Sequence, residues 1–331
     1  MGFEWFDGND HERSWLMTIA TIDPMRLWCP YDYRRNALIS VEDVELQLHA
    51  WAEKYGLLSD PVIAERFVGA RFGECAALVY PDAPDLLVYA KWLTWLFIAD
   101  DEFDENRAPT VGGIDAGVLD YLPLDGPSLK TPTTPVTVAL ADLWRELAPA
   151  MPRLLRERFR THVDQYARSY GSALAQSRTD EAPDLGPYVA LRRSSGAVET
   201  CMDLIERQPG AYLIPLIAGA EPVLALRAAA NDIICWTNDV LSIAKEIRHG
   251  EMNNLVAVLR GAIGMDWQAA LEAATEMNAV RTREFDRNQR ALLAANEFFA
   301  LSNFIDGLKL WISGSLRWHL GSPRYADSLA S

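Results

Sequence analysis

Long segments in which apolar residues recur at helical spacing constrain the fold of this chain more than any other feature. Proline and glycine fall between these segments, and alternating strand patterns with Asn-Gly or Asp-Gly turns are nearly absent. Hydrophobic residues make up 50% of the 331 residues, which is enough for a sizeable core. The sequence therefore predicts an all-α fold, a single large helical bundle around an apolar interior, with helices at about 41–55, 60–79, 85–105, 134–148, 151–177, 187–207, 222–249, 266–293 and 295–320.

The stretch 106–135 is rich in Pro, Gly and Thr and is the best candidate for a linker between two domains. We interpret it as a long loop within one domain, because the helices on either side carry parts of one candidate site. The predicted organisation is an irregular or partly helical N-terminal segment over 1–40, one catalytic domain over 41–325 and a tail over 326–331.

Charge and hydropathy exclude several classes of function. A net charge of −15 argues against binding to nucleic acid, which needs clustered Lys and Arg. The longest apolar stretch, 211–220, spans ten residues and contains Pro215 and Gly219, whereas a membrane helix needs about 20. The N-terminus lacks the pattern of a secretory signal, so we expect a cytoplasmic protein without stable membrane insertion. The 4 cysteines are widely spaced and are expected to be reduced core residues rather than zinc ligands.

An acidic cluster, "ADDEFDE" at 99–105, directly follows the apolar run "WLTWLFI". On a helix Asp100 and Asp104 lie within about 40° of each other, with Asp101 one step around. Unpaired carboxylates in a partly apolar setting are unfavourable, and a hard cation such as Mg²⁺ removes that penalty. The alternative is a solvated acidic helix end, which is the more common role of a charge cluster taken alone.

A second polar pattern, "NDVLSIAKE", lies within a long helical segment. Asn238, Ser242 and Glu246 stand at i, i+4 and i+8 and so share about 80° of one helix face. Lys245 lies about 20° from that face. Three ligands suited to a hard metal and one cation thus share a stripe, although an ordinary polar helix face is an equally good reading of this stretch alone.

A third and a fourth pattern bear on anion binding. Two arginines precede Ser194, Ser195 and Gly196 in a helical stretch, where the serines and glycine should kink the helix and leave backbone carbonyls unpaired. Arg192 beside the kink could grip an anionic group through two hydrogen bonds. Paired surface arginines and a tolerated glycine are the alternative. After the last helix, the dipeptide Arg324-Tyr325 adds two donors but carries little information by itself.

In combination, these four patterns resemble the motifs of the bacterial class I terpene synthases, or terpene cyclases. "DDEFD" at 100–104 matches the aspartate-rich DDxxD motif, and 238–246 matches the N(D/E)xx(S/T)xx(K/R)(D/E) motif in full. Arg192 lies 46 residues before Asn238, the family's spacing for a diphosphate-sensing arginine, and "RY" matches the family's C-terminal pair. Ser195 departs from the family, which often has an aspartate there to link the arginine to the kink.

The resemblance implies a Mg²⁺-dependent cyclisation of a linear isoprenyl diphosphate. Farnesyl diphosphate is the expected substrate, geranylgeranyl diphosphate is the alternative, and a C10 or C11 substrate is less favoured. A chain-elongating prenyltransferase and a non-catalytic metal-binding helical module are the rival functions, and the oligomeric state is open, with a homodimer as one alternative. Three Mg²⁺ ions are implied, two held mainly by Asp100 and the third by Asn238, Ser242 and Glu246. Asp101 and Asp104 would be secondary ligands or hydrogen-bond anchors.

The same resemblance implies roles for donors and for the cavity wall. Arg192, Lys245, Arg324 and Tyr325 would bind the diphosphate, and the carbonyl of Gly196 would face the substrate. Phe97 and Trp311 would stabilise carbocations through their aromatic faces, whereas Trp92 and Trp318 are expected to be core residues.

Overall fold

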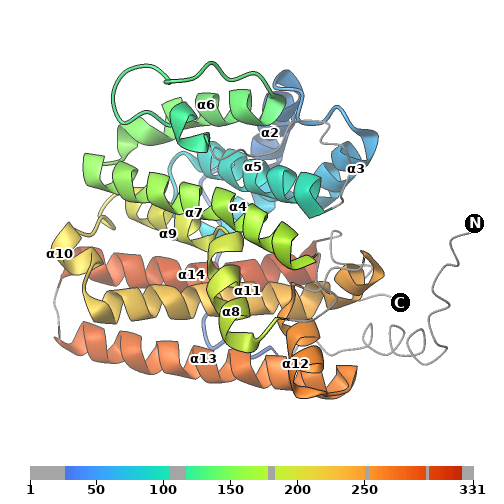
Figure 1. Ribbon diagram of the computed structural model, residues 1–331. Coiled ribbons are helices and arrows are strands. Elements are labelled where there is room, and N and C mark those ends of the chain that lie inside the picture. Colours follow the sequence, from blue (N-terminus) through green and yellow to red (C-terminus); the bar gives the residue numbers. More distant parts are fainter. Residues whose placement is uncertain (1–26, 105–116, 178–182, 250–252, 296–297, 323–331) are drawn as a thin grey trace, which may run out of the picture.

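The computed structural model describes residues 27–104, 117–177, 183–249, 253–295 and 298–322 (Figure 1). Among these residues all regular structure is helical, which confirms the predicted all-α fold. The helices are α2 (Val41–Lys54), α3 (Pro61–Ala70), α4 (Phe72–Val79), α5 (Leu86–Asp104), α6 (Pro135–Leu147), α7 (Arg153–Ser177), α8 (Leu185–Ser195), α9 (Val198–Arg207), α10 (Pro215–Ala218), α11 (Glu221–His249), α12 (Leu255–Ile263), α13 (Trp267–Ala295) and α14 (Phe299–Gly321), with 3₁₀ turns at Val118–Tyr121 and Ala148–Ala150.

Two predicted helices are each divided into two in the structure. The segment 60–79 breaks at Arg71, whose left-handed backbone (φ 52°) separates α3 from α4. The segment 187–207 breaks between α8 and α9 at Gly196 and Ala197, which confirms the predicted kink. The sequence prediction missed α12, because residues 255–259 are all buried and show no polar face that would mark a helical period.

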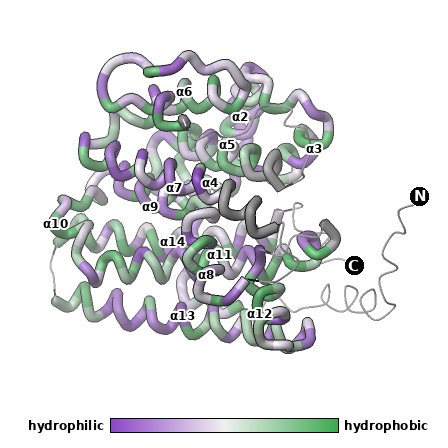
Figure 2. Tube along the Cα trace, in the orientation of Figure 1, coloured by the Kyte–Doolittle hydropathy of each residue, from purple (hydrophilic) through white to green (hydrophobic). Residues whose placement is uncertain are grey.

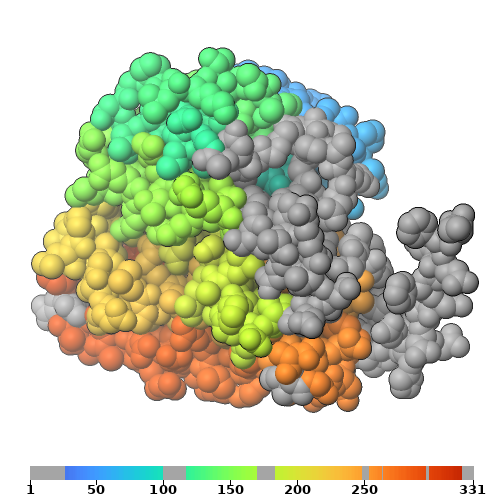
Figure 3. All heavy atoms as spheres, viewed as in Figure 1, coloured from blue at the N-terminus to red at the C-terminus, as the bar shows by residue number. Residues whose placement is uncertain are grey.

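The long helix α11 runs through the middle of the bundle. It packs against α13 on one side and against α14, α9 and the crossing helix α8 on the others (Figure 1). Hydrophobic and hydrophilic stretches alternate along α13, as expected of an outer helix that buries one face (Figure 2). The buried apolar side chains form one contiguous core. On the face shown in Figure 3, the described residues drawn in green, yellow and orange form one continuous surface.

Close packing of α14 on α4 sets the orientation of one wall of this bundle. A Cβ atom added at Gly314 would lie 2.5 Å from the carbonyl oxygen of Leu78, so only glycine allows this approach. The indole Nε1 of Trp318 donates to the carbonyl of Ala70 at 2.8 Å. These contacts direct one face of α14 toward the interior, where α5, α9 and α11 also meet.

Residues 27–40 contain no helix and pack on the bundle. The backbone N–H of Asn36 donates to Ala77 O at 2.9 Å, its side-chain amide donates to Ala83 O at 3.0 Å, and Ser313 donates to Asp32 O at 3.2 Å. The described part of the predicted loop packs in the same way, since Trp144 of α6 donates to Pro123 O at 2.9 Å. No helix in the described ranges combines the length and apolar character that crossing a membrane requires.

Candidate active site

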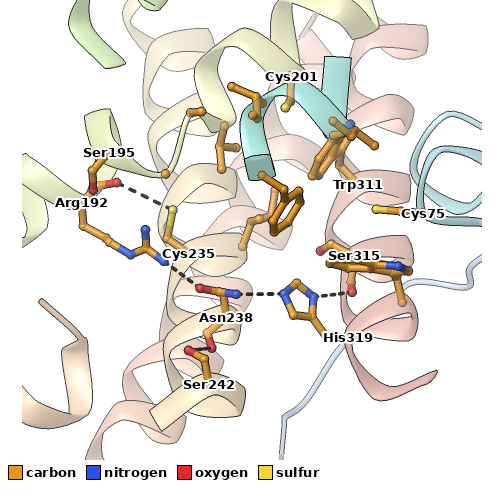
Figure 4. A pocket seen from close by; sticks show the side chains of 18 of the residues that line it. Cys75, Arg192, Ser195, Cys201, Cys235, Asn238, Ser242, Trp311, Ser315 and His319 are labelled. Atoms are coloured by element: carbon orange, nitrogen blue, oxygen red, sulfur yellow. Dashed lines mark hydrogen bonds between the residues drawn. The ribbon is translucent and has the colours of Figure 1, made fainter. Parts of the chain in front are cut away.

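A cavity of about 140 Å³ lies between α5, the α8–α9 kink, α11 and α14. In Figure 4 the polar side chains Arg192, Asn238 and Ser242 gather toward one end, and Trp311 and Cys201 lie toward the other. The predicted site residues that line this cavity are Phe97, Arg192, Gly196, Asn238, Ser242, Lys245, Glu246 and Trp311, and the lining also includes Leu93, Leu96, Cys75, Cys201, Cys235, Ser195, Trp318 and His319.

The polar stripe of α11 faces this cavity along its whole length. Asn238, Ser242, Lys245 and Glu246 all line it, because residues three or four apart share a helix face. The Ser242 hydroxyl donates to the carbonyl of Asn238 at 2.7 Å, which leaves the lone pairs of its oxygen for another partner. Burial and the nearby charge of Asp239 raise the pKa of Glu246 above its ordinary value.

The side-chain amide of Asn238 is held in one orientation by two neighbours. Arg192 Nη2 lies 2.9 Å from Asn238 Oδ1, and a guanidinium can only donate, so the amide oxygen must face Arg192. The amide nitrogen therefore faces His319 Nε2, at 3.1 Å. His319 Nδ1 lies 2.7 Å from the carbonyl of Ser315, which accepts its proton, so Nε2 carries the lone pair that receives the Asn238 N–H.

Asp239, the second residue of the α11 motif, binds Arg192 and does not line the cavity. Its Oδ1 accepts from Arg192 Nε at 3.0 Å, and its Oδ2 accepts from the Tyr188 hydroxyl and, at 3.0 Å, from the backbone N–H of Leu255. Burial would lower the pKa of Arg192, but the Asp239 carboxylate outweighs it and keeps this pKa well above its ordinary value. Arg192 therefore stays charged beside the cavity.

The kink between α8 and α9 is pressed against α11. A Cβ at Gly196 would lie 2.4 Å from Cys235 Sγ, so a glycine is needed for this approach. Ala197 follows with a left-handed backbone (φ 54°), a conformation that costs an alanine about 1–2 kcal/mol. Among the described residues the buried Ser195 hydroxyl has no hydrogen-bond partner, so Ser195 does not link Arg192 to the kink. Arg192 is held by Asp239 instead.

Aromatic rings from α5 and α14 form much of the apolar wall. The rings of Phe97 and Trp318 lie 5.4 Å apart between centroids, and Trp311 lies 5.6 Å from Tyr80. Trp318 was expected in the core, and it lines the cavity as well as packing against Phe97. Trp92 is a core residue as predicted, fully buried and donating to Thr200 Oγ1 at 3.1 Å.

Three thiols line the cavity, a feature that the sequence analysis did not assign to the site. Cys75, Cys201 and Cys235 are buried and form no disulfide. Burial raises the pKa of Cys201 and of Cys235 to about 12 and raises that of Cys75 well above its ordinary value. The thiols are therefore neutral and weakly nucleophilic, as the prediction of reduced core residues implied.

Several predicted site residues lie beyond what the structure describes. The backbone of Asp100, Asp101 and Asp104 forms the end of α5, about one helical turn after Phe97 for the first two and about two turns for Asp104. Their side chains are outside the described part. Arg324 and Tyr325 also fall outside the described residues.

The side-chain oxygen atoms of the α11 stripe are suitable ligands for a hard divalent cation. An amide oxygen, a hydroxyl oxygen and a carboxylate follow one another along the cavity, and Mg²⁺ prefers oxygen ligands of these kinds. Charged Arg192 and the ammonium of Lys245 line the same cavity and can donate to an anion. The arrangement is suited to a metal-bound anionic group attached to an apolar body.

Comparison with known proteins gives consistent matches. The family model described as "Terpene synthase family 2, C-terminal metal binding" matches residues 91–284. (+)-T-muurolol synthase ((2E,6E)-farnesyl diphosphate cyclizing) of Roseiflexus castenholzii is 34% identical over 84% of this chain and 87% of its own length. (−)-δ-Cadinene synthase of Streptomyces clavuligerus is 31% identical over 88% of this chain and 89% of its own. The crystal structure of germacradien-4-ol synthase from Streptomyces citricolor superimposes with a TM-score of 0.76, at 26% identity over 88% of this chain and 97% of that one.

Proposed function

We propose a reaction for this protein, which belongs to the class I terpene synthase family and is an enzyme of that class. It ionises farnesyl diphosphate, releases inorganic diphosphate and cyclises the resulting carbocation to a sesquiterpene hydrocarbon or alcohol. The observation that carries this proposal is the cavity in which the α11 stripe and Arg192 adjoin a wall of aromatic and aliphatic side chains.

The choice of a C15 substrate is supported by the relatives. The name of the Roseiflexus relative states that it cyclises farnesyl diphosphate, and the similarity to that relative extends over 84% of this chain. Geranylgeranyl diphosphate is thereby the less favoured substrate, and a chain-elongating prenyltransferase has no support among these matches.

A metal cofactor accompanies membership of this family, whose model is described as metal binding. We propose that the cofactor is Mg²⁺, with three ions held by Asn238, Ser242 and Glu246 on α11 and by Asp100, Asp101 and Asp104 at the end of α5. When bound, Mg²⁺ neutralises the charge of the diphosphate and so makes it a good leaving group.

The protein's own residues would perform the remaining tasks. Arg192 and Lys245 would donate to the diphosphate oxygens, together with Arg324 and Tyr325, and would hold the leaving group after the C–O bond breaks. The kink at Gly196 would present a backbone carbonyl to the developing cation. Exclusion of water from the cavity during the reaction would protect the cation from premature capture.

The apolar wall would guide the carbocation. Each aromatic face can stabilise a cation by roughly 0.5–2 kcal/mol, and Phe97, Trp311 and Trp318, which line the cavity, would do so. The thiols of Cys75, Cys201 and Cys235 are neutral, so they can contact the cation without the strong nucleophilicity of a thiolate.

The proposed function is tested by incubating the purified protein with farnesyl diphosphate and Mg²⁺. We expect Mg²⁺-dependent release of inorganic diphosphate and a cyclic C15 product in gas chromatography with mass detection. Asn238→Ala should lower turnover by about a hundredfold or more, because it removes a metal ligand. Gln47→Ala, a change on the exposed face of α2, serves as the control and should leave turnover unchanged.

Parallel incubations with C10 and C20 diphosphates, and with added isopentenyl diphosphate, separate the alternatives. Consumption of isopentenyl diphosphate, or turnover of the C20 substrate alone, would contradict the proposal. The cytoplasmic location, the catalytic domain bounds 41–325 and a homodimer stay predictions from the sequence.

A further inference from the structure

Asn254 is a fully buried side chain on the side of α11 that faces α12. Its Nδ2 donates to the carbonyl of Asp239 at 2.7 Å and to Glu246 Oε2 at 2.8 Å, and its Oδ1 accepts from the backbone N–H of Val256 at 2.8 Å. The amide orientation is unambiguous, because Val256 N–H can only donate and the Asp239 carbonyl can only accept. Both amide hydrogens and the amide oxygen are therefore in use.

The next residue supports the same part of α11. The backbone N–H of Leu255 donates to Asp239 Oδ2 at 3.0 Å, and Asp239 in turn holds Arg192. Two consecutive residues at the start of α12 thus fix two acidic groups of the α11 motif, one beside Arg192 and one at the end of the stripe. Asn254 does not line the cavity, and of the groups that accept from its amide only Glu246 does, so Glu246 is its direct link to the site.

We propose that Asn254 is a positioning residue that holds the Glu246 carboxylate in the orientation in which it binds the metal. This inference rests on the proposed function, because it takes Glu246 as a metal ligand. A glutamate side chain in a free site loses up to about 2 kcal/mol of conformational entropy when it is ordered. The Asn254 amide orders it beforehand, in the way that partners of metal ligands raise affinity elsewhere by about 10- to 100-fold.

The competing explanation is that Asn254 only caps α12. Serine separates the two roles, because it caps helices about as well as asparagine but lacks the two-proton amide. Asn254→Ser therefore retains an acceptor for Val256 and loses the bond to Glu246.

Asn278 of α13 provides a matched control, because its side chain also donates to α11. It is also buried, and its Nδ2 donates to the α11 carbonyl of Ile233 at 2.9 Å and to Thr237 Oγ1 at 3.1 Å, neither of which lines the cavity. Asn278→Ser thus removes the same kind of buried hydrogen bonds to α11 without touching Glu246.

The experiment measures the apparent Kd of the full-length protein for Mg²⁺ by calorimetry in the presence of inorganic diphosphate, together with Tm in the absence of metal. We expect Asn254→Ser to raise the Kd by about 10- to 100-fold, and Asn278→Ser to change it by less than about twofold, although both lower Tm. An equal Kd in the two variants would overturn the proposal, because the loss would then be structural.

A double-mutant cycle with Glu246→Gln tests the route of the effect. If Asn254 acts through Glu246, Asn254→Ser should have little further effect on Kd in the Glu246→Gln background. Additive effects would refute positioning through Glu246. If Glu246→Gln alone leaves Kd unchanged, Glu246 is not a metal ligand and the inference about Asn254 is wrong. The proposed function is tested separately, by turnover of farnesyl diphosphate by the unmodified enzyme.

Discussion

The Asn238 amide shows how single residues prepare the site. Its oxygen, the proposed metal ligand, accepts from Arg192, while its nitrogen is held by His319 of α14. Without the His319 lone pair, the amide nitrogen would lose its acceptor, and Arg192 alone would hold the oxygen in this orientation. A histidine 81 residues away thus helps Arg192 to fix the orientation of the Asn238 amide.

This reasoning predicts the effect of replacing His319. His319→Phe keeps a ring of similar size but removes the acceptor, and we expect the Mg²⁺ concentration for half-maximal turnover to rise by about tenfold or more. His319→Gln, which retains an acceptor oxygen, should recover part of the loss. The measurement is turnover of farnesyl diphosphate across a Mg²⁺ titration, and an unchanged Mg²⁺ requirement in His319→Phe would show that Asn238 is oriented by other contacts.

At the level of elements, the α8–α9 kink depends on the fit between one glycine and one sulfur atom. The backbone of Gly196 (φ −72°, ψ −7°) is open to any residue, so alanine would meet no conformational strain there. Its Cβ would instead overlap Cys235 Sγ, at 2.4 Å. The contact allows α8 to cross α11 closely enough for Arg192 to reach Asn238.

Gly196→Ala should therefore lower the free energy of unfolding by about 1–3 kcal/mol through overpacking. Cys235→Ala removes the overlapping atom, so we expect the double variant to be less destabilised than the sum of the two single variants. Urea unfolding of the three variants and the parent protein measures this coupling. Simple additivity would mean that the kink moves away from α11 and does not press on Cys235.

At the level of the whole molecule, a buried ionic network joins three helices of the bundle. Asp203 of α9 is fully buried and accepts from Arg158 Nε at 3.0 Å, from His162 Nδ1 at 2.7 Å and from Arg227 Nη2 at 2.9 Å. Burial would raise the pKa of Asp203, but the charges of His162 and Arg227 outweigh it and hold this pKa below its usual range. The network thereby ties α7 and α11 to α9, which follows the kink.

Asp203→Asn should destabilise the protein by about 3–5 kcal/mol near neutral pH, because it leaves buried cations without their carboxylate. The lowered pKa means that the stabilising contribution is complete above about pH 4 and is lost as the pH falls further. The stability difference between parent and variant should therefore shrink as the pH falls below about 4. Denaturant unfolding across this range checks the prediction, and a difference that does not change with pH would contradict it.

The sequence by itself determined the features that depend on neighbours within two helical turns. The all-α fold, the stripe of Asn238, Ser242 and Glu246, and the break at Gly196 all follow from helical periodicity or local backbone preference. The motif spacings that carried the family resemblance are local patterns of the same kind, and for this reason they were readable without coordinates.

Only the tertiary structure decided which distant residues complete the site. The local sequence pattern does not indicate that His319 contacts Asn238 or that Asp239 binds Arg192. It also does not indicate α12 with Asn254, or the three thiols that line the cavity. Each depends on the packing of one helix against another, which sets distance and direction between residues far apart in the chain. The sequence does not distinguish a buried histidine or asparagine that orients a metal ligand from one that only fills the core. The two roles differ in the residues that surround the side chain in space.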